Sequence, residues 1–301
     1  MQRLLLVGCG DVALRVADLL RHRVRLVGLT RHRDDVRKLR SHGIVPLQGD
    51  LDDFRSLARL DLGVSAVLHC APPPSEGRDD PRTRNLLAAL SGARIIPRHF
   101  VYLSTSGVYG DCAGARVAET RPVRAQTPRA RRRAAAERRL REWAGRNGVA
   151  LSILRVPGIY SSTRLPLVRL AHGTPALVAD EDVYTNHIHA ADLAHAAVAA
   201  LFFGRANRAY NVCDDAEMKM GAWFDIVADA YRLPRPPRVS WDDAERQIAP
   251  ILLSFMSESR RLTNGRMKRE LRVRLRHSTP HAMLARCAPR EVHRQLALPI
   301  D

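Results

Sequence analysis

Two glycines and a small residue near the start of the chain, Gly8, Gly10 and Ala13, have the spacing GxGxxA. Between a strand and a helix, the first glycine of this pattern allows a tight turn, and the second allows close approach of a pyrophosphate to the backbone. The helix that follows offers unpaired amides and the positive end of its dipole to an anion. An apolar run over 3–7 and an amphipathic run over 12–21 supply this context, so we predict a dinucleotide-phosphate site here.

The residues after the second predicted strand indicate which dinucleotide binds. NAD-binding folds of this type usually carry an acidic residue there for the ribose diol, whereas this chain has Thr30, Arg31 and Arg33. A guanidinium pairs well with a 2′-phosphate, so Arg31 favours NADP over NAD. The alternative is a solvated helix start in an arginine-rich chain. Asp50, after the third predicted strand, is placed to accept a hydrogen bond from the adenine amino group.

Short apolar runs alternate with amphipathic stretches through the first half of the chain. The predicted strands cover 3–7, 24–29, 44–47, 64–69, 99–104, 149–154 and 209–212, and the predicted helices 12–21, 34–42, 54–60, 82–91, 128–146, 190–203, 219–231 and 265–271. This alternation predicts an α/β fold of the Rossmann type, a doubly wound parallel sheet with helices on both faces. We assign 1–155, rejoined by about 186–213, to the dinucleotide-binding domain. Residues 156–185 and 214–301 are assigned to a smaller, discontinuous substrate domain.

The composition limits the classes of protein to which the chain can belong. The chain has 301 residues, of which 46% are hydrophobic, so it can bury a sizeable core. It has no apolar run of 18 residues, which argues against a transmembrane helix, and its first apolar run is too short for a signal peptide. Five cysteines without paired spacing fit reduced thiols. These features predict a cytoplasmic protein that is a monomer or homodimer.

The formal net charge of +18 comes almost entirely from arginine, because only three of the 49 basic residues are lysines. The excess is concentrated in two segments, 121–141 and 256–277. Such segments suit an anionic small-molecule site or a nucleic-acid surface, and a solvated helix face is the plain alternative. Few aromatic residues lie among the arginines, which disfavours nucleic acid as the partner.

Three further segments resemble one family. They read YLSTSGVYGD at 102–111, ILRVPGIY at 153–160 and NHIHAADLA at 186–194. With the glycine turn and the GDL at 49–51, they resemble the extended, nucleotide-sugar epimerase/dehydratase-like branch of the short-chain dehydrogenase/reductase superfamily, from Leu4 to about Val212. The resemblance places Thr105 at the position of the catalytic Ser/Thr.

The chain departs from this family at its YxxxK motif. Aligned on the following Ala-Glu, Arg129 stands at the tyrosine position and Arg133 at the lysine position, and 111–152 contain neither tyrosine nor lysine. A guanidinium stays protonated and cannot act as the base, so the chain resembles the atypical members. The predicted cofactor-binding residues are Gly8, Gly10, Asp11, Val12, Thr30, Arg31, Arg33, Asp50, Ala71 and Arg133.

Without the tyrosine, the catalytic candidates are Thr105 and Tyr109, which share one loop. The predicted substrate-binding residues are Arg155, Arg164, His187 and Arg260. No metal site is predicted, because His187 and His189 have no third ligand at a suitable spacing.

These residues predict an NADP-dependent oxidoreductase or epimerase/dehydratase-like protein that acts on a small anionic substrate of nucleotide-sugar type without the usual tyrosine base. The alternative is a non-catalytic NADP-binding sensor or scaffold, since loss of both motif residues is what relaxed catalytic demand produces. A nucleic-acid-associated protein that uses the face 121–141 is a third, weaker hypothesis, tested by salt-dependent DNA binding.

Overall fold

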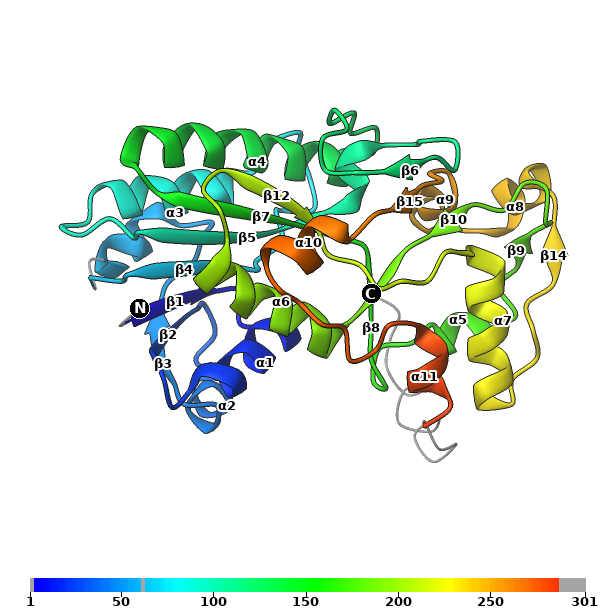
Figure 1. The fold of residues 1–301 in the computed structure, drawn as a ribbon, viewed down its shortest axis with the longest axis horizontal. Helices are drawn as coiled ribbons and strands as arrows, with labels where there is room; N and C mark the ends of the chain where they lie inside the picture. Colours follow the sequence, from blue (N-terminus) through cyan, green and yellow to red (C-terminus); the bar gives the residue numbers. More distant parts are fainter. Residues whose placement is uncertain (1–2, 61–62, 287–301) are drawn as a thin grey trace.

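The computed structural model describes residues 3–60 and 63–286, and the chain forms two parts (Figure 1). The larger part is built on a seven-stranded sheet with the order β12-β7-β5-β4-β1-β2-β3, in which every neighbouring pair is parallel. Its strands are β1 (Arg3–Val7), β2 (Arg25–Thr30), β3 (Ile44–Gln48), β4 (Ala66–His69), β5 (His99–Thr105), β7 (Ala150–Val156) and β12 (Arg208–Asn211). The predicted Rossmann-type parallel sheet is therefore present.

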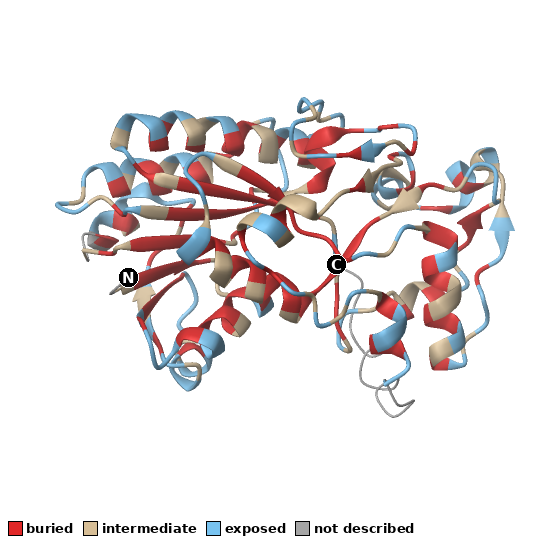
Figure 2. Ribbon diagram, in the orientation of Figure 1, coloured by how far each residue is buried: buried red, intermediate tan, exposed pale blue. Residues whose placement is uncertain are grey.

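Helices cover both faces of this sheet, as the apolar runs of buried strands require. One face packs against α1 (Asp11–Leu20), α2 (Asp35–Ser41), α6 (Ala190–Phe203) and α10 (Gly265–Glu270). The other face packs against the 3₁₀ helix η1 (Phe54–Leu60), α3 (Pro81–Ser91) and α4 (Pro128–Asn147). Figure 2 shows the strands almost wholly buried between the two helical layers.

The strand order reverses between β1 and β4. The chain runs from β1 outward through β2 and β3, and then returns to β4 on the other side of β1. Because parallel strands all end at the same edge, this reversal opens a crevice at their carboxyl ends, where α/β sheets bind ligands.

The smaller part has a core of its own (Figure 1). Its helices are α5 (Leu167–Ala171), α7 (Met220–Tyr231), α8 (Trp241–Gln247), α9 (Pro250–Met256) and α11 (Pro280–Leu284). Two-residue or three-residue strands join it to the sheet domain, as where β8 (Gly158–Tyr160) pairs in parallel with β11 (His187–His189). Further short pairs are β9 (Ala176–Leu177) with β14 (Arg238–Val239), β10 (Tyr184–Thr185) with β13 (Met218–Lys219), and β6 (Arg116–Val117) with β15 (Arg261–Leu262).

One segment that we assigned to the substrate domain packs elsewhere. Met267, Leu271 and Val273 are buried in the sheet core beside α1 and α6. An ion pair between Arg208 on β12 and Glu270 on α10, 2.6 Å long, holds this segment on the sheet edge. The segment around 265–275 therefore packs with the dinucleotide-binding core. Among the described residues, no helix is both long enough and apolar enough to cross a membrane.

Candidate functional site

A cavity of about 970 Å³ lies at the carboxyl ends of the strands, between the two parts of the molecule. Its walls bring together nine of the ten predicted cofactor residues: Gly8, Gly10, Asp11, Val12, Thr30, Arg31, Asp50, Ala71 and Arg133. Arg33, the tenth, does not line the cavity, although it is exposed nearby in sequence. Thr105, Arg164 and Arg260 line the opposite end. The same space therefore holds the predicted cofactor turn and part of the predicted substrate site.

The glycine turn has the geometry that close approach to a ligand requires. Gly8 has φ +86°, and a Cβ there would lie 2.4 Å from the backbone nitrogen of Ala71. That nitrogen donates a hydrogen bond to Val7 O, so the backbone that follows β4 leaves no room for a side chain at Gly8. Gly10 is the N-cap of α1 with φ −80°, and a Cβ there would meet nothing within 4 Å. The start of α1 thus faces open cavity, which suits a pyrophosphate.

The end of β2 presents one cation to the same space. Arg31 is exposed, and its Nε contacts the ring nitrogen of His32 at 2.7 Å. Thr30 is buried and donates its hydroxyl to Asp35 Oδ2 at 3.1 Å, which keeps that carboxylate engaged with the turn. Asp50 Oδ1 accepts the amide of Asp52 at 3.0 Å. The second carboxylate oxygen, Oδ2, accepts no hydrogen bond from the described residues, so it is the atom that the predicted contact with adenine would use.

Thr105 is the last residue of β5 and lines the cavity. Its Oγ1 accepts the amide of Gly107 at 3.2 Å, and its side chain is partly exposed. Arg133, at the lysine position of the family motif, donates to Leu103 O at 2.8 Å and to the Tyr102 hydroxyl at 3.1 Å. Arg133 therefore bridges β5 while it lines the cavity, and its orientation is set by the fold before any ligand binds.

Tyr109 does not lie in the cavity, so our prediction that it is catalytic has to be corrected. Its side chain is buried, and its hydroxyl donates to Asn211 Oδ1 at 2.7 Å. Burial raises the pKa of Tyr109 to about 12. The contact joins the loop after β5 to β12, which gives this phenol a structural role.

Two predicted substrate residues also point away from the cavity. Arg155 is buried and forms an ion pair with Glu137 on α4 at 2.8 Å, with both side chains 4% exposed. His187 is buried with its ring 4.4 Å from the ring of Trp223, and burial lowers its pKa to about 3. Neither residue lines the cavity. Both assignments are therefore corrected to structural roles.

Seven arginines line the cavity, and their partners divide them into two groups. The guanidinium groups of Arg82, Arg132, Arg133 and Arg260 donate to carboxylate or carbonyl oxygens of the protein. Those of Arg31, Arg129 and Arg164 have no oxygen acceptor in the part of the chain that the structure describes. An unpaired guanidinium in a cleft is a ready site for an anion, so these three mark where anionic groups would bind.

Sequence reasoning missed several residues of the cavity wall. Phe255 and Glu258 come from the segment after α8, and Arg129, in the family's tyrosine position, was not among the four predicted substrate-binding residues. For Arg129, the signal that could have found it is a local conflict. The first turn of α4 carries no acidic residue but holds Arg129, and cations are unfavourable at a helix start.

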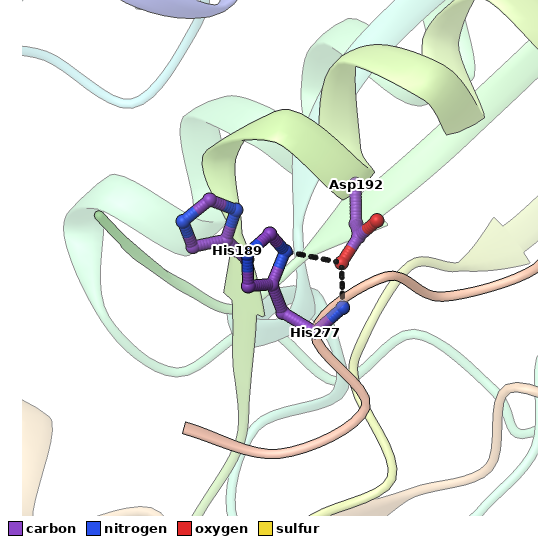
Figure 3. Close-up of side chains that lie close together, drawn as sticks. All are labelled: His189, Asp192 and His277. Carbon is purple, nitrogen blue, oxygen red and sulfur yellow. Dashed lines mark hydrogen bonds and ion pairs between the residues drawn. The ribbon is translucent and has the colours of Figure 1, made fainter. Parts of the chain in front are cut away.

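One group of potential metal ligands lies outside the cavity, formed by His189, Asp192 and His277 (Figure 3). Asp192 Oδ1 accepts the amide of Arg276, and Oδ2 accepts the amide of His277. The two imidazole rings stack with centroids 3.7 Å apart, and one ligand atom from each of the three residues lies within 4.8 Å of the other two. These contacts anchor 276–277 to the start of α6, and the prediction of no metal site stays a prediction.

Comparison with known proteins places the chain in a family. The model of the NAD dependent epimerase/dehydratase family matches residues 15–213, about two thirds of the chain. The chain therefore belongs to the NAD dependent epimerase/dehydratase family, as the resemblance in the sequence implied. The match begins just after the glycine turn. The family model therefore does not cover Gly8 and Gly10, and their geometry is known from the structure alone.

The individual relatives that we compared share 30% or less of their residues with this chain. The chain is 30% identical over 190 residues to the GDP-6-deoxy-D-mannose reductase of Pseudomonas aeruginosa, a match that covers 54% of this chain and 62% of that enzyme. A conserved protein of unknown function from Silicibacter pomeroyi has a TM-score of 0.79 and 29% identity over 95% of this chain and 98% of its own. The UDP-glucuronic acid 4-epimerase of Bacillus cereus, solved with UDP-glucuronic acid and NAD, has a TM-score of 0.76. Its identity is 16%, over 97% of this chain and 99% of its own, so this likeness concerns the fold.

Proposed function

We propose that the protein is an NADP-dependent oxidoreductase that acts on a small anionic substrate of nucleotide-sugar type and works without the family's tyrosine base. The observation that carries this proposal is a single cavity. It joins the glycine turn and Arg31 at one end to Thr105 and Arg164 at the other. The family to which the chain belongs supports a nicotinamide cofactor, and Arg31, whose guanidinium has no oxygen acceptor among the described residues, supports its 2′-phosphorylated form.

The cavity residues suit the parts of NADP in order. Gly8, Gly10 and the start of α1 would hold the diphosphate, and Thr30 and Arg31 the 2′-phosphate. Ala71 and Arg133 lie farther along, beside β5, where the nicotinamide ribose would sit. When bound, the nicotinamide ring gives or takes the hydride, and the protein positions the substrate against it.

Thr105 is the hydroxyl that we assign to the reacting end. It can donate a hydrogen bond to a substrate carbonyl oxygen or accept one from a substrate alcohol. Arg129 cannot take up a proton at neutral pH, although it can donate hydrogen bonds. The arrangement therefore suits hydride transfer to a positioned carbonyl, with the oxygen held by fixed donors.

The second candidate function is a non-catalytic NADP-binding sensor or scaffold. The observation that favours it is Arg133, which occupies the lysine position but is bound to the protein's own Leu103 O. NADPH oxidation measured across a panel of carbonyl compounds and sugar nucleotides separates the two functions. Turnover of any member supports the enzyme, and tight NADPH binding with no turnover of any member supports the sensor.

The choice of cofactor gives a first prediction. Replacing Arg31 by Asp should weaken NADPH binding by about 1–3 kcal/mol, the contribution of a charge-assisted hydrogen bond, and should leave NADH binding nearly unchanged. Calorimetric titration of both dinucleotides checks this. Arg33→Asp is the matched control, because Arg33 lies outside the cavity wall. Equal affinities for NADPH and NADH in the wild-type protein, untouched by Arg31→Asp, would contradict the assignment.

The two hydroxyls of the loop after β5 give a second prediction. Thr105→Val should lower turnover of an identified substrate by about 10²–10⁴-fold, the usual contribution of acid–base catalysis, with NADPH affinity retained. Tyr109→Phe should leave turnover unchanged but lower the free energy of unfolding by about 1–3 kcal/mol, because buried Asn211 loses a donor. Steady-state rates and urea unfolding of both variants test this. Full activity of Thr105→Val would remove Thr105 from the reaction.

A further inference from the structure

Arg129 occupies an unusual position at the start of a long helix. Thr127 caps α4 by accepting the amide of Ala130 at 3.3 Å, and Arg129 follows in the first turn. A Cβ at Gly107 would lie 3.5 Å from Ala130 Cβ, so this turn packs directly against the loop that begins at Thr105. Arg129 therefore stands beside the reacting end of the cavity.

The guanidinium of Arg129 is held by an aromatic ring and lacks an oxygen partner. Its Cζ lies 4.0 Å from the centroid of the Phe255 ring on α9, and both residues line the cavity. A cation–π contact orients a guanidinium but leaves its in-plane N–H donors available. In the described part of the chain, no oxygen accepts a hydrogen bond from them.

Glu258 adds a second unsatisfied group to the same wall. Its side chain is 6% exposed, and its Oε2 accepts hydrogen bonds from both terminal nitrogens of Arg260, each 2.9 Å long. Its Oε1 is buried and has no hydrogen-bond partner among residues 3–60 and 63–286. A buried carboxylate oxygen without a donor is costly, which indicates that a ligand hydroxyl or a water supplies one.

Hydrogen bonds tie the segment that holds Glu258 to the loop after β5. Arg260 also donates to Gly110 O at 2.7 Å, and the amide of Ser259 donates to Asp111 Oδ1 at 2.8 Å. These bonds tie 258–260 to the loop that follows Thr105. On the other side, the amide of Tyr184 donates to Ser259 Oγ at 3.0 Å, so the segment is also held by β10.

The charges of this group do not cancel. Arg260 neutralises Glu258, so the guanidinium of Arg129 is left as a net positive charge beside one acceptor oxygen. We propose that Arg129, Phe255 and Glu258 form a subsite for an oxyanion of the substrate, a carboxylate or a phosphate, that lies close to a hydroxyl. Arg129 donates to the oxyanion, and Glu258 Oε1 accepts the hydroxyl. This inference rests on the proposed function and specifies the substrate's polar end.

The subsite differs from that of Arg164. Arg164 lies in the loop after β8 on the substrate side and is exposed, whereas Arg129 is half-buried beside the Thr105 loop. A substrate with one acidic group near its reacting carbon would engage Arg129. A more distant diphosphate or similar group would engage Arg164.

Three sugars of matched shape test the subsite: glucose, glucuronate and glucose 1-phosphate. Each is titrated calorimetrically into the NADP⁺-loaded protein. At least one of the acidic sugars should bind about 10- to 100-fold more tightly than glucose, the factor expected for charge-assisted hydrogen bonds. The better of the two tells whether the oxyanion is a carboxylate or a phosphate.

Variants show whether Arg129 is responsible. Arg129→Gln should remove the advantage of the acidic sugar, and Arg129→Lys should restore part of it. Arg131→Gln, which removes the same charge from the exposed face of the same helix, should keep the advantage. Equal binding of all three sugars, or an advantage that survives Arg129→Gln, overturns the subsite while NADP⁺ binding stands. Failure of the wild-type protein to bind NADP⁺ overturns the proposed function first, and this inference with it.

Discussion

A Gly10→Val variant should lose measurable NADP binding and still fold. Gly10 has a negative φ and an extended conformation that valine readily adopts, and a Cβ there meets no atom within 4 Å in the unliganded protein. The branched side chain would instead fill the space above the start of α1 that the diphosphate has to enter. Calorimetric titration with NADPH, together with circular dichroism, measures both parts of the prediction.

Two glycine variants serve as comparisons for Gly10→Val. Gly145→Val, in the exposed part of α4, should bind NADPH normally, because a Cβ there also meets nothing but lies away from the cavity. Gly8→Ala should fail to fold properly, since its positive φ and the Ala71 backbone at 2.4 Å leave no room for a methyl group. Tight NADPH binding by Gly10→Val would show that the diphosphate lies elsewhere.

The buried pair of Arg155 and Glu137 should have the largest effect on stability. Glu137→Leu leaves the Arg155 guanidinium buried without its carboxylate, and it also removes the acceptor of the Ser104 hydroxyl at 2.6 Å. We expect the free energy of unfolding to fall by about 3–5 kcal/mol. Urea unfolding followed by circular dichroism measures the loss.

A double variant distinguishes the cost of an unpaired buried charge from the cost of altered packing. Glu137→Leu combined with Arg155→Met should lose less stability than Glu137→Leu alone, because no uncompensated charge stays buried. Glu142→Leu, an exposed change on the same helix, should stay within about 0.5 kcal/mol of the wild-type protein. If the double variant is instead less stable than Glu137→Leu alone, the loss of stability comes mainly from altered packing and not from an unpaired buried charge.

The sheet and its cofactor turn could be predicted because their signals are local. Each of the seven sheet strands lies within two residues of its predicted bounds, since buried parallel strands read as apolar runs between breakers. The helices α8, α9 and α11 were missed. They contain seven residues or fewer, too few for a 3.6-residue period to emerge from the sequence.

The errors in the site have a common physical cause. Successive side chains of a strand point to opposite sides, so a residue type alone does not say which neighbour reaches a cavity. Val156 lines the cavity while Arg155 faces α4, and Asn186 lines it while His187 packs on Trp223. Glu258 could not be placed because the hydrogen bonds that hold its segment, from Arg260 to Gly110 O and from Ser259 to Asp111 Oδ1, join parts of the chain more than 120 residues apart.

The most direct test of the proposed cofactor site is a crystal structure of the protein grown with NADP⁺. We expect the diphosphate on the amides at the start of α1, next to Gly10, with the 2′-phosphate within hydrogen-bonding distance of Arg31 and the nicotinamide beside Thr105. Density for the dinucleotide outside this cavity, or a 2′-phosphate that Arg31 does not contact, would contradict it.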